Sequence, residues 1–387
     1  MAALNDPLQA AQALHSAIVE ARHETEQTRR LPPAIVERLR ETGLCRLVVP
    51  ASVGGLETDP LLALEIFEEL ASAEASVAWI VWNNALPCFS SALFPERIQT
   101  ELFGDTQRLF ANSTRPSGKA VTTDNGFRVS GRWSLVSGCE LADWIPVMCF
   151  VMDGDVPRRL DNGMPEARMM YVPKGSYTIV DTWHVAGLRG TGSHDVVVDN
   201  VLVPTERTYS YFDPIQLDRP LYRMPFLATM SAGCAAICLG LAKTARSSLQ
   251  ELAATKQKAN PGPGIQSQTT VQTLMATSAA ELSAARLLLH TTLGEVWSTC
   301  KQGAPVTPDQ CARLWQSALH TARVARTAVT TIYEVAGTDA IYEDCPIERI
   351  HRDIHVIAQH IILSPMRLED AGRMSLGLAP KDALFFR

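Results

Sequence analysis

The sequence has few of the features that mark nucleic-acid-binding proteins. It contains no tract of five or more basic residues, and its 35 Lys and Arg residues are outnumbered by 41 Asp and Glu residues, which gives a net charge of −6. Proteins that bind nucleic acid gather positive charge against the phosphates, so nucleic acid is not an expected partner. Hydrophobic residues make up 46% of the chain and charged residues 20%, as is usual for a globular protein.

The sequence also has little that points to secretion, a metal site or a membrane. Its nine cysteines form no Cys-x-x-Cys pair, and several lie within apolar runs, which favours buried thiols in a reducing compartment. The longest apolar segment, residues 226–242, is interrupted by small and polar residues and is shorter than the roughly 20 residues of a membrane span. The N-terminal residues lack the basic and then apolar pattern of a signal peptide. We therefore expect a cytoplasmic protein.

The spacing of hydrophobic residues divides the chain into three blocks. Residues 1–105 follow a helical period, with Ala63, Ile66 and Leu70 on one stripe. Residues 106–215 alternate between apolar and polar and are rich in turns, such as the hairpin signal at residues 124–126, which predicts a β-barrel or sandwich. Residues 216–387 return to the helical period. The predicted fold class is α+β, with an N-terminal helical domain, a middle β domain and a C-terminal four-helix bundle. The four expected bundle helices are 225–256, 265–299, 308–337 and 346–372.

The segment 349–360 holds three histidines on a predicted helix. His351 and His355 share a face, but no carboxylate stands where a zinc protease would need it, so we expect no metal. His360 follows Asp353 by seven residues and would lie on the same face of a continuous helix. Because imidazole titrates near neutrality, His360 is a candidate for proton transfer.

Other catalytic signatures are missing or ambiguous. No Gly-x-Ser-x-Gly motif is present, so nothing supports a Ser-His-Asp hydrolase. Residues 187–193 read GLRGTGS, but predicted strands flank them on both sides, unlike a Rossmann turn. This loop could approach an anionic or flavin ligand through N–H and hydroxyl groups, or it could be an ordinary turn. Trp133 and Ser137, four residues apart on a predicted strand, would share a face that could meet a flat heterocycle, or would simply be part of the sheet.

These patterns occur together, and in the same order, in the acyl-CoA dehydrogenase fold, which the chain resembles over nearly its whole length. Two features of the dehydrogenases are missing. Residues 357–362 contain no counterpart of the glutamate base that takes a proton from acyl-CoA, and residues 259–264 stand in place of the Arg-Phe-Gly motif that helps to hold FAD. The resemblance rests on Val48-Val49-Pro50 with Gly54-Gly55, on Glu68-Glu69-Leu70-Ala71, on residues 125–133 with Ser137-Gly138, and on residues 195–204.

The chain is more similar to the oxygenase components of two-component flavin monooxygenases, such as 4-hydroxyphenylacetate 3-hydroxylases, steroid-ring phenol hydroxylases, dibenzothiophene monooxygenases and indole oxygenases. In that group the glycine-rich loop and an Arg-Asp…His ending recur, here as residues 187–193 and Arg352-Asp353…His360. The resemblance implies reduced FAD or FMN from a separate reductase, no metal, and O₂ that reacts through a C4a-hydroperoxyflavin. It also implies a small aromatic or heteroaromatic substrate of the phenol or indole type, and a homotetramer.

The resemblance further implies roles for particular residues. His360 would act as a base or as a protonated imidazole, and the Ser137 hydroxyl would lie near flavin N5. Trp79, Asn84 and His360 would contact the substrate. The implied cofactor-binding set is Ser113, Thr114, Trp133, Ser137, Gly138, Arg189, Thr191, Ser193 and Gly337.

Two alternatives stay open on the sequence alone. One is an acyl-CoA dehydrogenase with its base elsewhere, for which Glu334 and Glu343 are candidates. The other is a non-catalytic binding or assembly subunit. The sequence does not determine which substrate atom (carbon, nitrogen or sulfur) would be oxidised, nor whether the cofactor is FAD or FMN.

Overall fold

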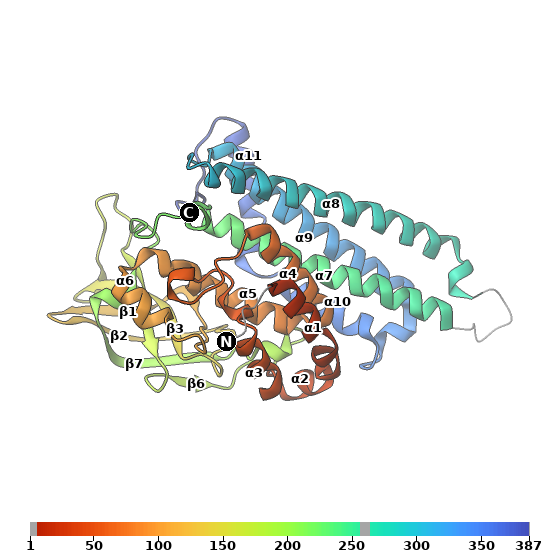
Figure 1. Cartoon of the computed structure of the whole chain (residues 1–387), viewed down its shortest axis with the longest axis horizontal. Coiled ribbons are helices and arrows are strands. Elements are labelled where there is room, and N and C mark those ends of the chain that lie inside the picture. The colour runs from red at the N-terminus through yellow and green to blue at the C-terminus, as the bar shows by residue number, and fades with distance from the viewer. Residues whose placement is uncertain (1–5, 256–263, 387) are drawn as a thin grey trace.

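The computed structural model describes residues 6–255 and 264–386 of the 387-residue chain. Helices fill the first block, and Figure 1 shows them, in red to orange, in the middle of the view. The helix α4 (Pro60–Ala73) has a capped start, because Asp59 Oδ1 accepts a hydrogen bond of 2.9 Å from Leu61 N and Pro60 takes the first helical position. These helices are α1 (Pro7–Glu20), α2 (Arg22–Thr28), α3 (Pro33–Glu41), α4 (Pro60–Ala73), α5 (Ala75–Phe89) and α6 (Glu96–Phe103).

The second block forms an eight-stranded sheet with the order β6-β7-β2-β1-β3-β5-β8, and β4 pairs with β3. The predicted hairpin is confirmed, since Thr123 and Gly126 pair across the turn between β1 and β2. Only β1 and β3 pair in parallel among the described strands. The strands are β1 (Ser113–Thr123), β2 (Gly126–Trp133), β3 (Trp144–Asp153), β4 (Val156–Pro157), β5 (Ala167–Pro173), β6 (Thr178–Val180), β7 (Asp195–Val203) and β8 (Thr208–Tyr209).

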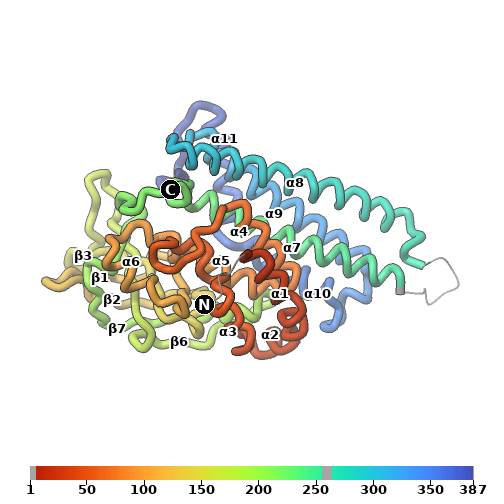
Figure 2. The backbone as a smooth tube through the Cα atoms, in the orientation of Figure 1, coloured from red at the N-terminus to blue at the C-terminus, as the bar shows by residue number. Residues whose placement is uncertain are grey.

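The third block is helical again, and three of its four predicted long helices are confirmed. Figure 2 shows α7 (Phe226–Thr255), α8 (Thr269–Lys301) and α9 (Pro308–Ala336) running alongside one another. By length and composition α7 could cross a membrane, but 78% of its most apolar window is buried inside the protein, as in a core helix. The segment that replaces the Arg-Phe-Gly motif, 259–264, lies outside the described residues except for its last position.

The fourth predicted helix, 346–372, is wrong, because the chain forms α10 (Pro346–Ile357), a short turn (Ile361–Leu363) and α11 (Met366–Ser375). Pro365 lacks a backbone N–H and disfavours helical backbone in the residue before it. Ser364 is accordingly extended, with ψ 137°. His360 therefore lies in the connection and not on the helix.

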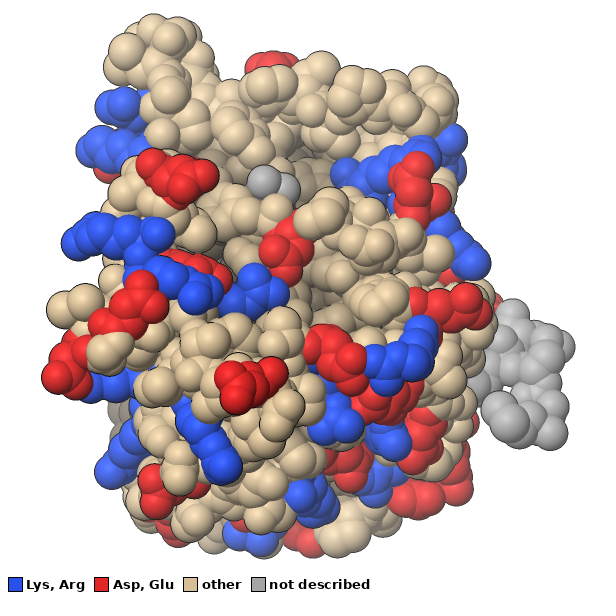
Figure 3. Space-filling model, turned by 90° about the vertical axis from the view of Figure 1, so that its left-hand side faces the viewer, with Lys and Arg blue, Asp and Glu red and all other residues tan. Residues whose placement is uncertain are grey.

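Two cores hold these blocks together. One apolar cluster joins the N-terminal helices to α7, α8, α9 and α10, and a second fills the sheet around Trp133. Helices end at Phe103, strands begin at Ser113 and long helices resume at Phe226, near the predicted boundaries at 105 and 215, which themselves stay a prediction. On the face in Figure 3, charges of both signs are interspersed.

Candidate active site

Ser137 lies where the sheet meets α5, in a chain of buried hydroxyl groups. Its Oγ accepts a hydrogen bond of 3.0 Å from the indole Nε1 of Trp79 and lies 2.7 Å from Ser193 Oγ. Ser193 Oγ lies 2.7 Å from Thr191 Oγ1, which donates to the carbonyl oxygen of Leu188 at 2.8 Å. All three hydroxyl-bearing residues are buried. The chain thus runs without a gap from an aromatic side chain of α5 into the glycine-rich loop.

The backbone around Ser137 is also fixed. The amide of Asn83, on α5, donates to the carbonyl oxygen of Ser137 at 3.1 Å, and Gly138 N donates to Thr191 O at 2.9 Å. Gly138 has φ +74°, and a Cβ there would lie 3.0 Å from Ile80 Cδ1. A glycine is required at this position because only glycine readily adopts that conformation.

The glycine-rich loop between β6 and β7 is packed against helices and is not a free turn. A Cβ on Gly187 would lie 2.6 Å from the carbonyl carbon of Arg352, and one on Gly190 would lie 2.2 Å from Thr25 Cγ2. These glycines allow the loop backbone to touch α10 and α2. This packing is contrary to a free turn, and contact of the loop with an anionic or flavin ligand stays a prediction.

Asp353 anchors this loop to α10. Its Oδ1 accepts a hydrogen bond of 2.6 Å from Leu188 N. Burial, and then the nearby Glu74 carboxylate, raise the pKa of Asp353 to about 7. Arg352 pairs with Glu348 at 2.6 Å and with Glu26 at 2.8 Å. The predicted support of His360 by Asp353 and Arg352 is wrong, because both side chains are used by other partners.

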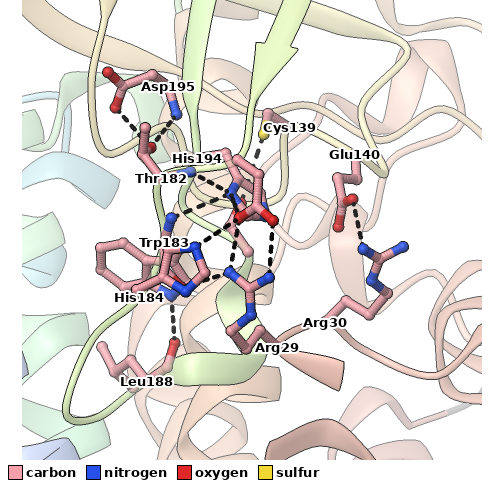
Figure 4. A network of polar contacts seen from close by, with 12 residues as sticks. Arg29, Arg30, Cys139, Glu140, Thr182, Trp183, His184, Leu188, His194 and Asp195 are labelled. Carbon is pink, nitrogen blue, oxygen red and sulfur yellow. Dashed lines mark hydrogen bonds and ion pairs between the residues drawn. The ribbon is translucent and has the colours of Figure 1, made fainter. Parts of the chain in front are cut away.

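A second network holds the outer side of the same loop (Figure 4). The indole Nε1 of Trp183 donates to Leu188 O at 3.1 Å. The backbone N–H groups of Thr182 and Trp183 donate to His194 Nδ1 at 3.2 and 3.3 Å. Burial lowers the pKa of His194, so its ring is neutral and acts as an acceptor. Arg29 ties α2 to this region through two bonds to Asp181, of 2.7 and 2.9 Å.

His360 lies edge-on to two indole rings of α5. Its ring centroid is 5.2 Å from that of Trp79 and 5.5 Å from that of Trp82, with interplanar angles of 78° and 86°. Burial, assisted by the charge of Arg115, lowers the pKa of His360 to about 4. The imidazole is therefore neutral at pH 7. Its Nδ1 accepts from Ile362 N at 3.3 Å, which leaves the hydrogen on Nε2, and Nε2 has no hydrogen-bond partner among the described residues.

Comparison with known proteins places this arrangement in a family. The N-terminal and C-terminal domains of acyl-CoA dehydrogenases match residues 9–93 and 232–365. Indole-3-acetate monooxygenase of Acinetobacter baumannii is 32% identical over 84% of this chain and 82% of its own length. The chain belongs to the flavin-dependent monooxygenases of the acyl-CoA dehydrogenase fold.

Further relatives agree with this assignment. The oxygenase subunit HsaA of Mycobacterium tuberculosis is 29% identical over 93% of this chain and 92% of its own length. Its crystal structure superposes with a TM-score of 0.89 at 28% identity and covers 98% of this chain and 99% of that one. The structure of XiaF from Streptomyces, in complex with FADH2 and glycerol, gives a TM-score of 0.88 at 26% identity over 97% and 96% of the two chains. The predicted fold, enzyme class and flavin cofactor of the monooxygenase are confirmed.

Two residues predicted for the site, Trp133 and Asn84, make structural hydrogen bonds within the protein instead. Trp133 is completely buried in the core of the sheet, where its Nε1 donates to Met148 O at 2.8 Å. Because β2 ends at Trp133, its predicted common face with Ser137 is wrong. The Asn84 amide donates to Cys45 O and accepts from Phe110 N at 2.6 Å, so both ends of this buried amide hold the backbone of the protein itself.

Asn83, the neighbour of Asn84 on the same predicted helix, holds the Ser137 backbone, a role that the sequence did not indicate. The helical period distinguishes a buried face from an exposed one, but every residue of α5 is buried. The period therefore could not show which of the two asparagines contacts Ser137.

The other predicted residues are placed as follows. Ser113 and Thr114 begin β1, buried and half-buried, and Gly337 is an exposed residue at the end of α9. Arg189 reaches Glu26 at 3.4 Å, while its Nε is buried without a hydrogen bond among the described residues. These cofactor contacts stay predictions.

The two remaining histidines of the segment have structural partners. The His351 ring stacks on Tyr333 with centroids 4.2 Å apart, and His355 Nδ1 lies 2.8 Å from His351 O. Within residues 6–255 and 264–386, no three His, Cys, Asp or Glu side chains are grouped as a metal would need.

A separate cavity of about 270 Å³ contains none of the predicted site residues. It lies beyond the far end of α5, where Phe89 follows Trp79 by roughly three turns, or about 15 Å. Its aromatic lining is Phe89, Tyr209, Tyr211, Tyr222, Phe226 and Phe386.

Proposed function

We propose that this monooxygenase uses reduced flavin, supplied by a separate reductase, to oxygenate a small indole-like or phenolic compound. The observation that carries the proposal is the wall formed by Trp79, Trp82 and His360, which is joined to the Ser137 hydroxyl by a single hydrogen bond. Relatives named indole-3-acetate monooxygenase and FADH(2)-dependent resorcinol hydroxylase support an aromatic substrate. Flavin, when bound, supplies the electrons that activate O₂.

The residues around Ser137 fit a flavin. Of the three hydrogen-bonding positions of Ser137 Oγ, Trp79 and Ser193 use two, and the third is open to a flavin ring nitrogen, while the buried Arg189 Nε lacks an acceptor among the described residues. We propose that Ser113, Thr114, Gly138 and Gly337 complete the cofactor site with Thr191 and Ser193. Trp133 leaves the proposed set because none of its surface is exposed.

We propose that His360 acts in its neutral form, with Nε2–H donated to the substrate or to the oxygen being transferred. The low pKa of about 4 and the hydrogen bond from Ile362 N support a neutral donor over the protonated imidazole considered from the sequence. The two buried tryptophans, whose ring centroids are 4.6 Å apart, exclude water from the same space. Trp79 has two tasks, since its ring faces His360 while its Nε1 holds Ser137.

We further propose that the substrate carries an acidic substituent that Arg115 binds. Arg115 lies on β1, one position after Thr114, and its charge acts on His360. It is exposed and has no hydrogen bond or ion pair with another described residue. An arginine without a carboxylate partner at the edge of an aromatic site suits an aromatic acid.

The test is steady-state turnover with a flavin reductase, NADH, and FMN or FAD, with indole, indole-3-acetate and phenol compared as substrates. Product and H₂O₂ are measured separately. For Arg115→Gln we expect the KM for indole-3-acetate to rise between tenfold and about a hundredfold, as for a lost charge-assisted hydrogen bond, while the KM for indole changes little.

Arg128→Gln, on the neighbouring strand β2, is the matched control and should behave as wild type, because Arg128 only bonds to Asn200 O at 3.0 Å. Equal changes in KM for indole-3-acetate and for indole in Arg115→Gln would contradict the acid-binding role of Arg115. Absence of any aromatic product with every substrate, despite bound flavin, would contradict the proposed function itself.

We also propose a homotetramer. Of the seven large apolar side chains more than 60% exposed among the described residues, four lie in and after the connections that follow α9 and α10, namely Ile341, Tyr342, Ile361 and Met366. Apolar groups exposed in this number suit an interface between subunits. Light scattering on the purified protein measures the assembly directly, and a monomer would contradict the proposal.

A further inference from the structure

The separate cavity beyond the end of α5 has walls of aromatic rings that contact one another in an unbroken series. The ring of Tyr211 packs against those of Tyr209 and Phe226, with centroids 5.7 and 6.1 Å apart. The ring of Phe89 packs against Phe226 at 4.8 Å and against Tyr222 at 5.5 Å. All five residues line the cavity. Because each ring is held by its neighbours, the walls are already formed, as they are in most small-molecule sites.

The cavity has the size and the open side that a small ligand needs. Its volume of about 270 Å³ is near the lower end of the range of about 300–1,000 Å³ that is usual for small-molecule sites. Ala92 and Cys311 line it and are buried, whereas Ile215 and Phe386 line it and are exposed. The cavity therefore reaches from the core to the surface. A bound apolar ligand would cover the two exposed side chains, which favours binding.

Asp213 supplies a free hydrogen-bond acceptor at this cavity. Its Oδ2 accepts from Ser210 N at 2.9 Å and from Arg168 Nη2 at 3.1 Å. Its Oδ1 has no hydrogen-bond partner in the part of the chain that the structure describes. A carboxylate oxygen accepts hydrogen bonds and repels a second carboxylate. The cavity therefore suits a ligand with an N–H or O–H group and disfavours an acid.

No other lining group among the described residues offers a charge to a ligand. Arg223 lines the cavity, but its guanidinium bonds to Asp218 at 2.5 and 2.7 Å and to Cys300 O at 3.3 Å. Burial raises the pKa of Tyr209 to about 12 and the pKa of Tyr211 well above its ordinary value, so both hydroxyls stay neutral. An anion would thus find repulsion from Asp213 and no free cation.

We propose that this cavity is a second binding site, for a small aromatic molecule that carries a hydrogen-bond donor and no negative charge. The five rings favour a flat aromatic ligand, because paired rings attract one another beyond the burial of their area. The ligand donates its N–H or O–H to Asp213 Oδ1. This preference is opposite to that of the proposed catalytic site, where Arg115 suits an aromatic acid. The second site does not depend on the proposed function, because it rests on the cavity alone.

The experiment counts the indole molecules bound per chain at saturation, by equilibrium dialysis of the purified full-length protein. Indole is the probe because it has an N–H group and no charge. Val306 lines the cavity and is half-buried, so Val306→Trp fills the cavity from its edge. We expect this variant to bind about one indole fewer per chain than wild type. Val156→Trp adds the same ring at an exposed position of β4 and should keep the wild-type number. Circular dichroism checks that each variant is folded.

Asp213→Asn tests the preference against acids, because it removes the negative charge and keeps an acceptor. For each ligand, the binding that Val306→Trp abolishes is the binding at the cavity. The dissociation constant of indole at the cavity should stay within about threefold of wild type. That of indole-3-acetate should fall about tenfold, since a repulsion between like charges has been removed.

Three results would overturn the second site. The first is an equal number of bound indole molecules in wild type and Val306→Trp. The second is binding of indole-3-acetate at the wild-type cavity as tight as that of indole. The third is a loss of indole turnover in Val306→Trp that matches its loss of binding, because the cavity would then serve the catalytic site. Wild-type protein that oxygenates no aromatic compound would contradict the proposed function and not the second site, because the count of bound indole requires no catalysis.

Discussion

Replacing His360 by glutamine separates two properties of this side chain, its ability to donate a hydrogen bond and its ability to take up a proton. Glutamine is neutral at every pH and still offers an amide N–H to the site and an oxygen to Ile362 N. The structure gives His360 a folded-state pKa of about 4, against an ordinary value of 6.5, because it is buried beside Trp79 and Trp82 and near Arg115. The His360→Gln variant therefore keeps the donor and removes the titration.

The effect on stability has a definite sign and size. The unfolded chain takes up a proton on this histidine below about pH 6.5, and the folded chain does so only below about pH 4. The stabilisation that wild type gains from burying a neutral His360 is therefore complete above pH 6.5. It is lost as the pH falls from about 6.5 to about 4. At pH 5 the loss amounts to about 2 kcal/mol relative to pH 8. His360→Gln should lack this loss.

Urea unfolding of wild type and variant at pH 8 and pH 5 provides the measurement. The difference in unfolding free energy between the two proteins should shift in favour of the variant by about 2 kcal/mol on going to pH 5. His184→Gln, a substitution of a histidine whose side chain is 67% exposed, is the control and should follow wild type. Identical pH dependence of wild type and His360→Gln would refute the neutral, buried imidazole.

Turnover at pH 7.5 then tests the proposed chemical role. If His360 serves as a neutral donor, His360→Gln should retain product formation within about tenfold of wild type. His360→Ala should lose roughly a hundredfold to a thousandfold, as when a donor to a transition state is removed. Equal losses in both variants, with flavin still bound, would show that the imidazole has a task that an amide cannot perform.

Three further predictions concern the surroundings of the site. Gly187→Ala should lower the free energy of unfolding by about 1–3 kcal/mol, since the added Cβ would lie 2.6 Å from the backbone of Arg352; unchanged urea unfolding would contradict this packing. Asp353→Asn keeps an acceptor for Leu188 N but cannot ionise. Because the raised pKa of about 7 makes wild type lose stability as the pH rises from about 4 to 7, the melting temperature of the variant should gain on wild type between pH 5 and pH 8. Asn84→Ala should destabilise the fold by about 1–3 kcal/mol, from a buried backbone group left without its partner, and should leave KM unchanged in steady-state assays.

The order of the three blocks and the hydroxyl groups of the site could be predicted from the sequence, because helix and strand periods and a glycine-rich loop are local signals. Ser137, Thr191 and Ser193 were selected in this way, and the structure brings their hydroxyls together. The other partners of these hydroxyls could not be predicted, since they are a backbone carbonyl at Leu188 and an indole on α5.

The errors have specific causes. The helix through His360 was extended too far, because α10 ends at Ile357 and His360 is extended, with ψ 137°, and caps the next turn through its own ring. Asp353 was assigned to His360 for the same reason. Its true partner, Leu188, lies 165 positions away in the chain, and no periodic pattern reports a contact of that range.

That long-range bond also orders the events of folding. The loop with Thr191 and Ser193 cannot take its final form until α10 has docked, because Gly187 and Leu188 lie against Arg352 and Asp353. We expect contacts so distant in sequence to form late, because the entropy of closing the intervening chain must first be overcome. A chain whose C-terminal helices have not yet packed therefore has strands and helices but no finished Ser137 environment. Competence for oxygen chemistry arrives only with the last part of the fold.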